Sequence, residues 1–129
     1  MAIRFLSLAE ALLIHQDQIA RYGGGPGIRD MDLLKSALGM PPATFGGEFL
    51  HADVFDMAAG YLFHLVKNHP FVDGNKRTGV VAALVFLSLN GFDFQASEDD
   101  LVEMVLAVAR GEMDKARVAV LIREGSRPI

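Results

Sequence analysis

Apolar residues recur along most of this chain with the spacing of an amphipathic α-helix. From Leu8 onward they return every three or four positions, and the same spacing appears in five later segments. Ser7 and Glu10 form the pattern of a capping box in front of the first segment. Glycine and proline runs, or an Asp or Ser that can cap a helix, separate the segments. With the caps of the third and fifth included, the predicted helices cover residues 8–22, 31–38, 53–68, 75–90, 97–110 and 113–124.

The fourth predicted helix is apolar nearly all round and carries an unbroken apolar run from Val80 to Leu87. A helix that is apolar on every side is covered by other elements. We therefore expect an all-α fold: a compact bundle of about six helices around a buried central helix, in a single domain of residues 1–129. Residues 43–51 carry a Gly-Gly pair between phenylalanines and predict a loop or small hairpin, and residues 92–94 predict a brief extended segment.

Composition narrows the possible partners. The net charge of −4 argues against direct binding of nucleic acid, which requires an excess of Lys and Arg. The longest apolar run is too short for a bilayer, which needs about 20 residues, so we expect a cytoplasmic protein that does not bind membranes. His15, His51 and His64 show no metal-ligand spacing on a shared helical face, and we expect His15 and His64 to point to solvent.

The most informative segment is His-Pro-Phe-Val-Asp-Gly-Asn-Lys-Arg, residues 69–77, directly before the apolar helix. Lys76 and Arg77 stand in the first turn of that helix with no acid beside them. Cations there oppose the helix dipole at a cost of about 0.3–1 kcal/mol each, whereas free backbone N–H groups at a helix start attract anions. The pattern predicts an anion at this place, and phosphate is the first candidate.

The other residues of the segment complete a possible site for phosphoryl-type transfer. Pro70 keeps His69 out of the helical region, so its imidazole lies in a loop and can take a proton from a hydroxyl at neutral pH. Phe71 is the expected core anchor of this loop, and Gly74 allows the backbone to approach a phosphate closely. Asp73 offers the oxygen ligands that Mg²⁺ prefers when it already carries phosphates.

Two further groups complete the predicted phosphate cradle: Asn75 with the amides that follow it, and Arg77, which can bind phosphate oxygens in a bidentate manner.

Each residue also has a purely structural interpretation. His69 could be an ordinary helix-end histidine, Asp73 a helix cap, and Gly74 a turn residue. Arg77 could pair with a carboxylate elsewhere. The functional interpretation depends on their co-occurrence at fixed spacing ahead of a buried helix.

Residues 69–77 resemble the Fic/Doc signature, His-x-Phe-x-(Asp/Asn)-(Gly/Ala)-Asn-(Gly/Lys)-Arg, with every fixed position filled. Residues 27–30, 33–38 and 86–91 resemble the Doc (death-on-curing) branch, and the similarity extends over residues 22–91, with weaker agreement beyond. The resemblance implies a Fic/Doc-like bundle.

The resemblance also implies a role for each signature residue. His69 would be the general base, Asp73 would hold Mg²⁺, Gly74 and Asn75 would form the anion cradle, and Arg77 would bind phosphate. Lys76 stands where Fic enzymes that transfer AMP usually carry glycine. Doc-like proteins carry lysine there and are understood to bind ATP in the reversed sense and transfer its γ-phosphate.

For this chain the resemblance therefore implies an ATP-dependent Ser/Thr protein kinase and a toxin of a toxin–antitoxin pair. Its target would be a threonine of elongation factor Tu, whose modification halts translation. AMP transfer, or a non-catalytic Fic-like binding module, remains an alternative.

Control and target binding have weaker signals. Many Fic proteins block the phosphate-binding Arg with a Ser/Thr-x-x-x-Glu-Gly/Asn helix, but Val120 replaces the hydroxyl residue ahead of Glu124. Thr44 and Glu48 have the spacing but surround two glycines. We expect no internal brake and a Phd-like antitoxin in its place, which would lay an amphipathic helix into an apolar groove. Residues 43–51 could be the flap that holds a target or a plain connector.

Overall fold

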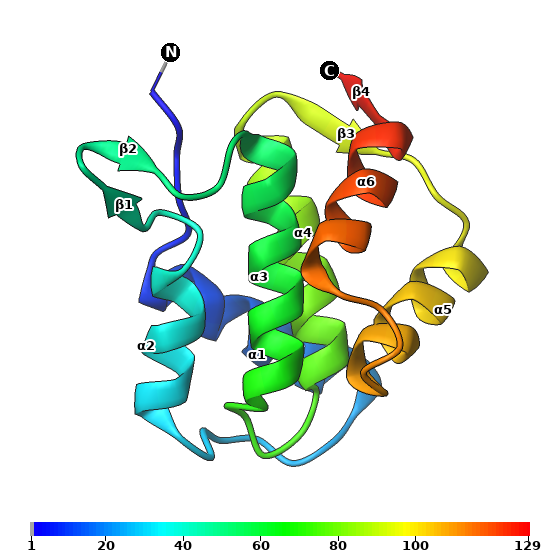
Figure 1. Ribbon diagram of the computed structural model, residues 1–129. Helices are drawn as coiled ribbons and strands as arrows, with labels where there is room; N and C mark the ends of the chain where they lie inside the picture. The colour runs from blue at the N-terminus through cyan, green and yellow to red at the C-terminus, as the bar shows by residue number, and fades with distance from the viewer. Residues whose placement is uncertain (1) are drawn as a thin grey trace.

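The computed structural model describes residues 2–129 and confirms the all-α class. Helices in this range begin and end within two residues of the predicted positions. They are α1 (Leu8–Tyr22), α2 (Met31–Gly39), α3 (Val54–Asn68), α4 (Asn75–Leu89), α5 (Glu98–Ala109) and α6 (Lys115–Gly125). Figure 1 shows them as a compact bundle with α3 and α4 in the middle.

Residues 2–129 also form two short antiparallel strand pairs. The predicted hairpin at residues 43–51 is present, with β1 (Thr44–Phe45) paired to β2 (Glu48–Phe49). The predicted extended segment is β3 (Phe92–Phe94). Its partner β4 (Ser126–Pro128), which the sequence pattern did not predict, brings the end of α6 to the end of α4.

The core lies between α3 and α4. Tyr61 of α3 and Phe86 of α4 are fully buried, with ring centroids 5.1 Å apart. Gly79 lets the two helices approach, because a Cβ atom there would lie 3.2 Å from the Leu62 carbonyl oxygen. The short connection between α3 and α4, residues 69–74, is therefore fixed by a well-packed pair of helices.

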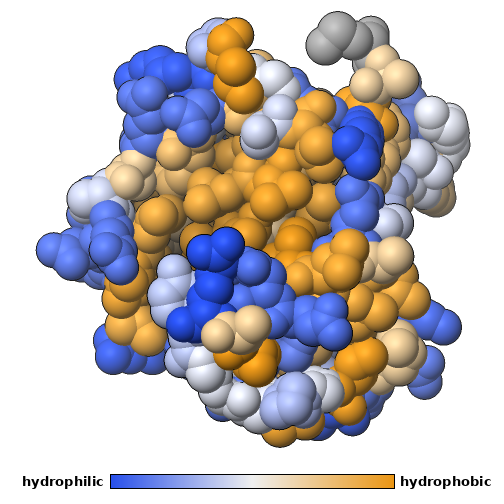
Figure 2. Space-filling view, turned by 180° about the vertical axis from the view of Figure 1, so that it is seen from behind, coloured by the Kyte–Doolittle hydropathy of each residue, from blue (hydrophilic) through white to orange (hydrophobic). Residues whose placement is uncertain are grey.

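One face of α4 is less covered than its apolar sequence predicted. Val80, Val81, Leu84 and Val85 are only half-buried. Figure 2 shows the side opposite to Figure 1, so α4, which lies behind α3 in Figure 1, is here in front of it. Apolar side chains spread over much of the upper half of this face. α4 is thus the predicted central helix, buried at Thr78, Ala82 and Phe86 among others and half-buried on this side. No helix among residues 2–129 is long and apolar enough to cross a membrane.

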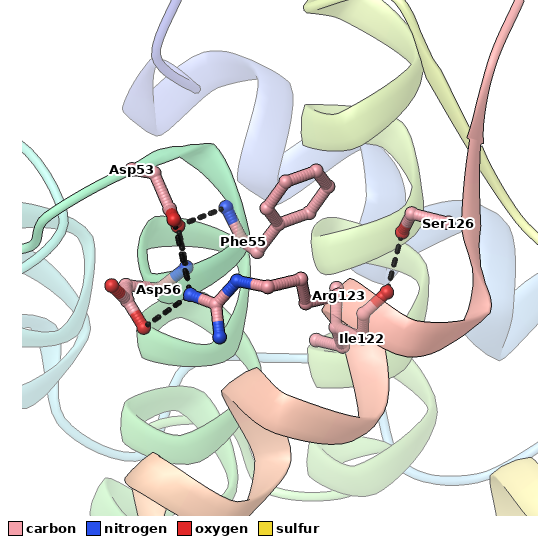
Figure 3. Close-up of polar contacts among 6 residues, drawn as sticks. All are labelled: Asp53, Phe55, Asp56, Ile122, Arg123 and Ser126. Carbon is pink, nitrogen blue, oxygen red and sulfur yellow. Dashed lines mark hydrogen bonds and ion pairs between the residues drawn. The ribbon is translucent and has the colours of Figure 1, made fainter.

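The start of α3 is tied to α6 by charge. Asp53 accepts hydrogen bonds from the backbone N–H groups of Phe55 and Asp56, both at 3.0 Å. The Arg123 guanidinium lies 3.0 Å from Asp53 Oδ2, 3.4 Å from Asp56 Oδ1 and 5.8 Å from the centre of the Phe55 ring. Figure 3 shows Arg123 reaching across from α6 to both carboxylates. The chain therefore caps and neutralises this helix start by itself.

Two histidines lie elsewhere than expected. His15 is buried, because its ring packs under the α3–α4 turn rather than facing solvent. His64 is half-buried, and its Nε2 lies 3.3 Å from Lys115 Nζ. His51 approaches the same ammonium group at 3.1 Å. Since Lys115 has only protons to donate, both imidazoles accept its hydrogen bonds.

Candidate active site

The turn that joins α3 to α4 begins with a left-handed residue. His69 ends α3 with φ 50° and ψ 53°, and among residues 2–129 it is the one non-glycine residue with positive φ. Such a conformation costs about 1–2 kcal/mol for a residue with a side chain. It turns the chain sharply into Pro70 and leaves the His69 side chain exposed at the surface.

A neighbouring segment holds this unusual conformation in place. Arg29 donates hydrogen bonds to the carbonyl oxygens of His69, at 2.6 Å, and Asn68, at 3.0 Å. These carbonyl oxygens lie at the end of α3, where no N–H group of the helix remains to bond them. A cation at a helix C-terminus is also stabilised by the helix dipole. The Arg29 backbone N–H donates to the Pro70 carbonyl at 2.7 Å. Arg29 therefore fixes the backbone that carries the candidate base, through contacts with three carbonyl oxygens.

Phe71 anchors the centre of the turn. Its side chain is fully buried. The Asn75 side chain is also buried, and both of its polar ends are used locally: Oδ1 accepts the Phe71 N–H at 2.9 Å and Nδ2 donates to the Phe71 carbonyl at 3.0 Å. The buried Asn75 side chain therefore closes the turn, and the Asn75 backbone N–H, at the uncapped start of α4, can contribute to the expected anion cradle.

The first turn of α4 has no capping side chain. Gly74 is its N-cap with φ 77°. The first turn contains no acid. A Cβ atom at position 74 would lie 3.1 Å from Ile19 Cδ1 and 3.4 Å from Arg77 Nη2, so glycine keeps this corner clear. A helix start without a cap leaves its first N–H groups for an outside acceptor.

Asp73 stands at the edge of this opening. Its Oδ1 accepts the Gly74 N–H at 2.8 Å, and its Oδ2 accepts the Gly25 N–H at 3.3 Å. The bonds from Gly74 and then Gly25, followed by the charges of Arg77 and Lys76, hold the pKa of Asp73 below its ordinary value. The side chain is thus a carboxylate at neutral pH.

Arg77 and Lys76 supply the positive charge. Arg77 Nη2 donates to the Gly23 carbonyl at 2.9 Å, and its guanidinium lies 5.7 Å from the centre of the Tyr22 ring. Lys76 is exposed. Within residues 2–129 no carboxylate lies within ion-pair distance of Arg77. Neither Glu124 nor Glu48 therefore blocks it, and the remaining guanidinium N–H groups can bind an anion.

The donor set fits a nucleotide's phosphates together with Mg²⁺. Residues 2–129 hold no cluster of three acidic, His or Cys side chains that could bind a metal by themselves. One carboxylate with free lone pairs is nevertheless what Mg²⁺ uses when phosphates and waters fill its other positions. Asp73 has that capacity, because each of its oxygens accepts only one hydrogen bond from the chain.

Two parts of this site were not identified from the sequence. The glycine run of residues 23–27 ends α1, as predicted, but it also contacts both Asp73 and Arg77. His15 of α1 also contacts the turn, at the Asp73 carbonyl oxygen. No short-range pattern places either beside residues 69–77, since 48 positions separate Gly25 from Asp73 and 58 separate His15 from it.

Comparison with known proteins identifies the class to which this site belongs. A family model described as the Fic/DOC family matches residues 5–87, a range that contains the complete turn and most of α4. The chain therefore belongs to the Fic/Doc family.

Within the family the similarity is to Doc proteins, as the signature residues indicated. The chain is 34% identical over 121 residues to the protein named "Protein kinase doc" of Escherichia phage P1, and the match covers 94% of each chain. It is 40% identical over 89 residues to "Toxin Doc" of Mycolicibacterium smegmatis, covering 64% of this chain and 68% of that protein.

Proposed function

We propose that this protein is a Doc-type toxin, a protein kinase that transfers the γ-phosphate of ATP to a hydroxyl group of a target protein. The observation that carries the proposal is the exposed imidazole of His69 beside an uncapped helix start that bears Lys76 and Arg77. The name of the phage P1 relative, a protein kinase, supports the same chemistry. By family resemblance the target is a threonine of elongation factor Tu, and its modification would halt translation.

The residues of the turn divide the work of this reaction. His69 accepts the proton of the target hydroxyl as its oxygen forms a bond to the γ-phosphorus, and the bond from that phosphorus to the β–γ bridging oxygen breaks to release ADP. Arg77, Lys76 and the free N–H groups of α4 bind the phosphate oxygens. Asp73 holds Mg²⁺, which supplies further neutralisation of phosphate charge when it is bound.

Lys76 favours γ-phosphate over AMP transfer. It is exposed at the second position of α4, close to the opening, and it adds both bulk and a positive charge where AMP-transferring relatives carry glycine. A bulky cation at this point favours the terminal phosphates in the cradle and disfavours a nucleotide whose α-phosphate must reach His69.

The proposed control by an antitoxin is supported by the lack of an ion-pair partner for Arg77 among residues 2–129. With no carboxylate of residues 2–129 in place to block it, restraint would have to come from another chain, and a Phd-like antitoxin is the partner that the resemblance implies. An apolar groove of about 570 Å³ along α1, lined by Leu12, Leu13 and Ile19 among others, is of a kind that receives an amphipathic helix.

The decisive experiment follows the label from ATP. Elongation factor Tu is incubated with the protein and with ATP labelled at the γ- or the α-phosphate, and the product is weighed by mass spectrometry. We expect the γ-label and one added phosphate on a threonine. His69→Ala should lower the rate by about 10²–10⁴-fold, the usual contribution of a general base. Lys67→Ala, an exposed neighbour in the last turn of α3, is the matched control and should retain full activity.

The alternatives give different results in the same experiment. Transfer of the α-label would identify an AMP transferase and overturn the role given to Lys76. No label on any protein, together with harmless overproduction of the wild type in bacteria, would favour a non-catalytic binding module. Full transfer by His69→Ala would remove His69 from its role.

A further inference from the structure

His15 lies behind the signature turn, on a helix that the signature does not include. The side chain is 5% exposed. Its ring lies flat on the Phe71 ring, with centroids 3.8 Å apart and planes 5° apart. Its Nε2 is 2.9 Å from the carbonyl oxygen of Asp73. A carbonyl oxygen can only accept, so Nε2 carries the proton and donates it, and in the neutral ring Nδ1 is bare.

This hydrogen bond acts on a peptide unit that also controls the Asp73 side chain. The unit contains the Asp73 carbonyl and the Gly74 N–H. Its oxygen is held by His15, and its N–H donates to Asp73 Oδ1 at 2.8 Å. The plane of this one peptide therefore sets the direction of the carboxylate, and His15 sets the plane. The second tie on the carboxylate is longer, 3.3 Å from the Gly25 N–H.

The stacking contact fixes the same turn at a second point. Phe71 is fully buried, and its backbone is bound at both polar groups by Asn75. A ring that packs on Phe71 and also bonds to Asp73 determines how far the turn lies from α1. His15 thus contacts both ends of the segment from Phe71 to Asp73 and forms no hydrogen bond with His69.

We propose that His15 is a positioning residue that aims the Asp73 carboxylate at the cation accompanying the nucleotide's phosphates. The inference rests on the proposed function, because it takes Asp73 as the Mg²⁺ ligand. Groups that orient a metal-binding side chain change metal affinity by about 10–100-fold when they are removed. His15 acts through the peptide unit and does not approach the transferred phosphate.

Two substitutions separate the hydrogen bond from the packing. His15→Phe keeps a flat ring on Phe71 but cannot donate to Asp73. His15→Gln loses the ring but keeps an amide N–H at a similar reach. The matched control is His64→Phe, the same exchange at a half-buried histidine of α3 that contacts Lys115 of α6. A residue that only fills space predicts that His15→Phe is the milder change, and a positioning residue predicts the reverse.

The readout is metal binding rather than transfer. Mn²⁺ serves as the probe for Mg²⁺ and is titrated by electron paramagnetic resonance in the presence of a non-hydrolysable ATP analogue. We expect the apparent dissociation constant of Mn²⁺ to rise at least about tenfold in His15→Phe, to stay within about threefold of wild type in His15→Gln, and to be unchanged in His64→Phe. Equal constants in His15→Phe and wild type, or equal losses in both His15 variants, would overturn the proposal.

A measurement on the wild type covers the case in which a variant does not fold. Nitrogen NMR of the His15 ring should show a protonated Nε2 and a bare Nδ1, and a bare Nε2 would also overturn the proposal. The metal-binding experiment can fail or succeed independently of the test of kinase activity. A wild type that binds Mn²⁺ with the analogue but transfers no phosphate contradicts the kinase and leaves His15 in place. A wild type that binds neither Mn²⁺ nor the ATP analogue contradicts both the proposed kinase and the proposed role of His15.

Discussion

The two central helices begin in opposite ways. At the start of α3, Asp53 caps two backbone N–H groups, and Arg123 from α6 neutralises both Asp53 and Asp56 (Figure 3). At the start of α4, the cap is Gly74, no side chain accepts the free N–H groups and two cations follow. The difference shows that the chain can satisfy a helix start when nothing else has to bind there. The unsatisfied start of α4 therefore supports the anion site that we propose there.

A third helix start shows that a cation in the first turn is not sufficient. Lys115 opens α6, yet it lies 3.1 Å and 3.3 Å from the Nε2 atoms of His51 and His64. Its helix also has a cap, Asp114, which accepts the Arg117 N–H at 2.8 Å. What distinguishes α4 is the combination of an absent cap, absent acid and cations without an acceptor side chain.

The largest expected effect comes from comparing the two arginines that lie at the starts of α4 and α3, Arg77 and, reaching across from α6, Arg123. Arg77→Ala should lower phosphate transfer by about 10²-fold or more. It removes charge-assisted hydrogen bonds to phosphate of about 1.5–3 kcal/mol each, and each 1.4 kcal/mol is a factor of ten. Arg123→Ala should leave transfer unchanged. The measurement is the initial rate of γ-label transfer at saturating target.

Arg123→Ala should instead act on stability. Its carboxylate partners are 40% and 27% exposed, so each ion pair contributes about 1 kcal/mol or less. A variant series in which both arginines affect transfer alike, or neither does, would contradict the functional difference between the two starts.

Much of the fold was predictable from the sequence because local signals agree with the tertiary structure. Ser7 with Glu10 caps α1 as predicted, with both capping-box hydrogen bonds present, and Asp53 caps α3. The strand β4 was not predictable, because only the packing of α6 brings residues 126–128 beside β3.

A second prediction concerns the self-satisfied start of α3. Asp53→Ala removes the cap of two N–H groups and leaves Arg123 with Asp56 alone. Loss of a helix cap costs about 0.5–2 kcal/mol, and the weakened ion pair adds to it. We expect the free energy of unfolding in urea to fall by about 1–2 kcal/mol while γ-phosphate transfer per folded molecule stays at the wild-type level. Asp53→Asn keeps a capping oxygen and should lose less.

For the candidate site, the sequence predicted the residues that follow one another in the chain but not the contacts that they make in three dimensions. The spacing of residues 69–77 placed the base, the carboxylate and the cations around one helix start. It did not show that the Asn75 side chain closes the turn on Phe71, since that depends on the turn's three-dimensional path. The burial of His15 was missed because a histidine spaced among apolar residues of an amphipathic helix is compatible with either face.

A third prediction concerns the pH dependence of stability, which should report the contact of Lys115, at the start of α6, with two histidines. Burial first, then the charge of Lys115, lowers the pKa of His64 to about 4, and the same causes lower the pKa of His51. Unfolded imidazoles titrate near about 6.5. Between these values the unfolded chain binds more protons, so the free energy of unfolding rises with pH from about 4 to 6.5 and levels off above.

Urea unfolding at several pH values checks this slope. His64→Gln keeps an acceptor for Lys115 but does not titrate in this range, so its slope should be smaller than that of the wild type. Carboxylates contribute equally to both proteins and cancel in the comparison. An identical slope would show that His64 binds its proton equally well in the folded and unfolded states.

The smallest expected effect is the most specific, because the same substitution should act with opposite sign at two helix starts. Lys76→Gln removes a cation that opposes the dipole of α4 and has no acceptor side chain, so stability should rise by about 0.3–1 kcal/mol while phosphate transfer falls. Lys115→Gln gains the same amount from the dipole of α6 but loses two hydrogen bonds of about 0.5–1.5 kcal/mol each. Stability should therefore fall, and transfer should not. Urea unfolding of both variants measures the two signs. Equal signs would mean that the start of α4 is satisfied within the chain after all, and the anion site would lose its physical basis.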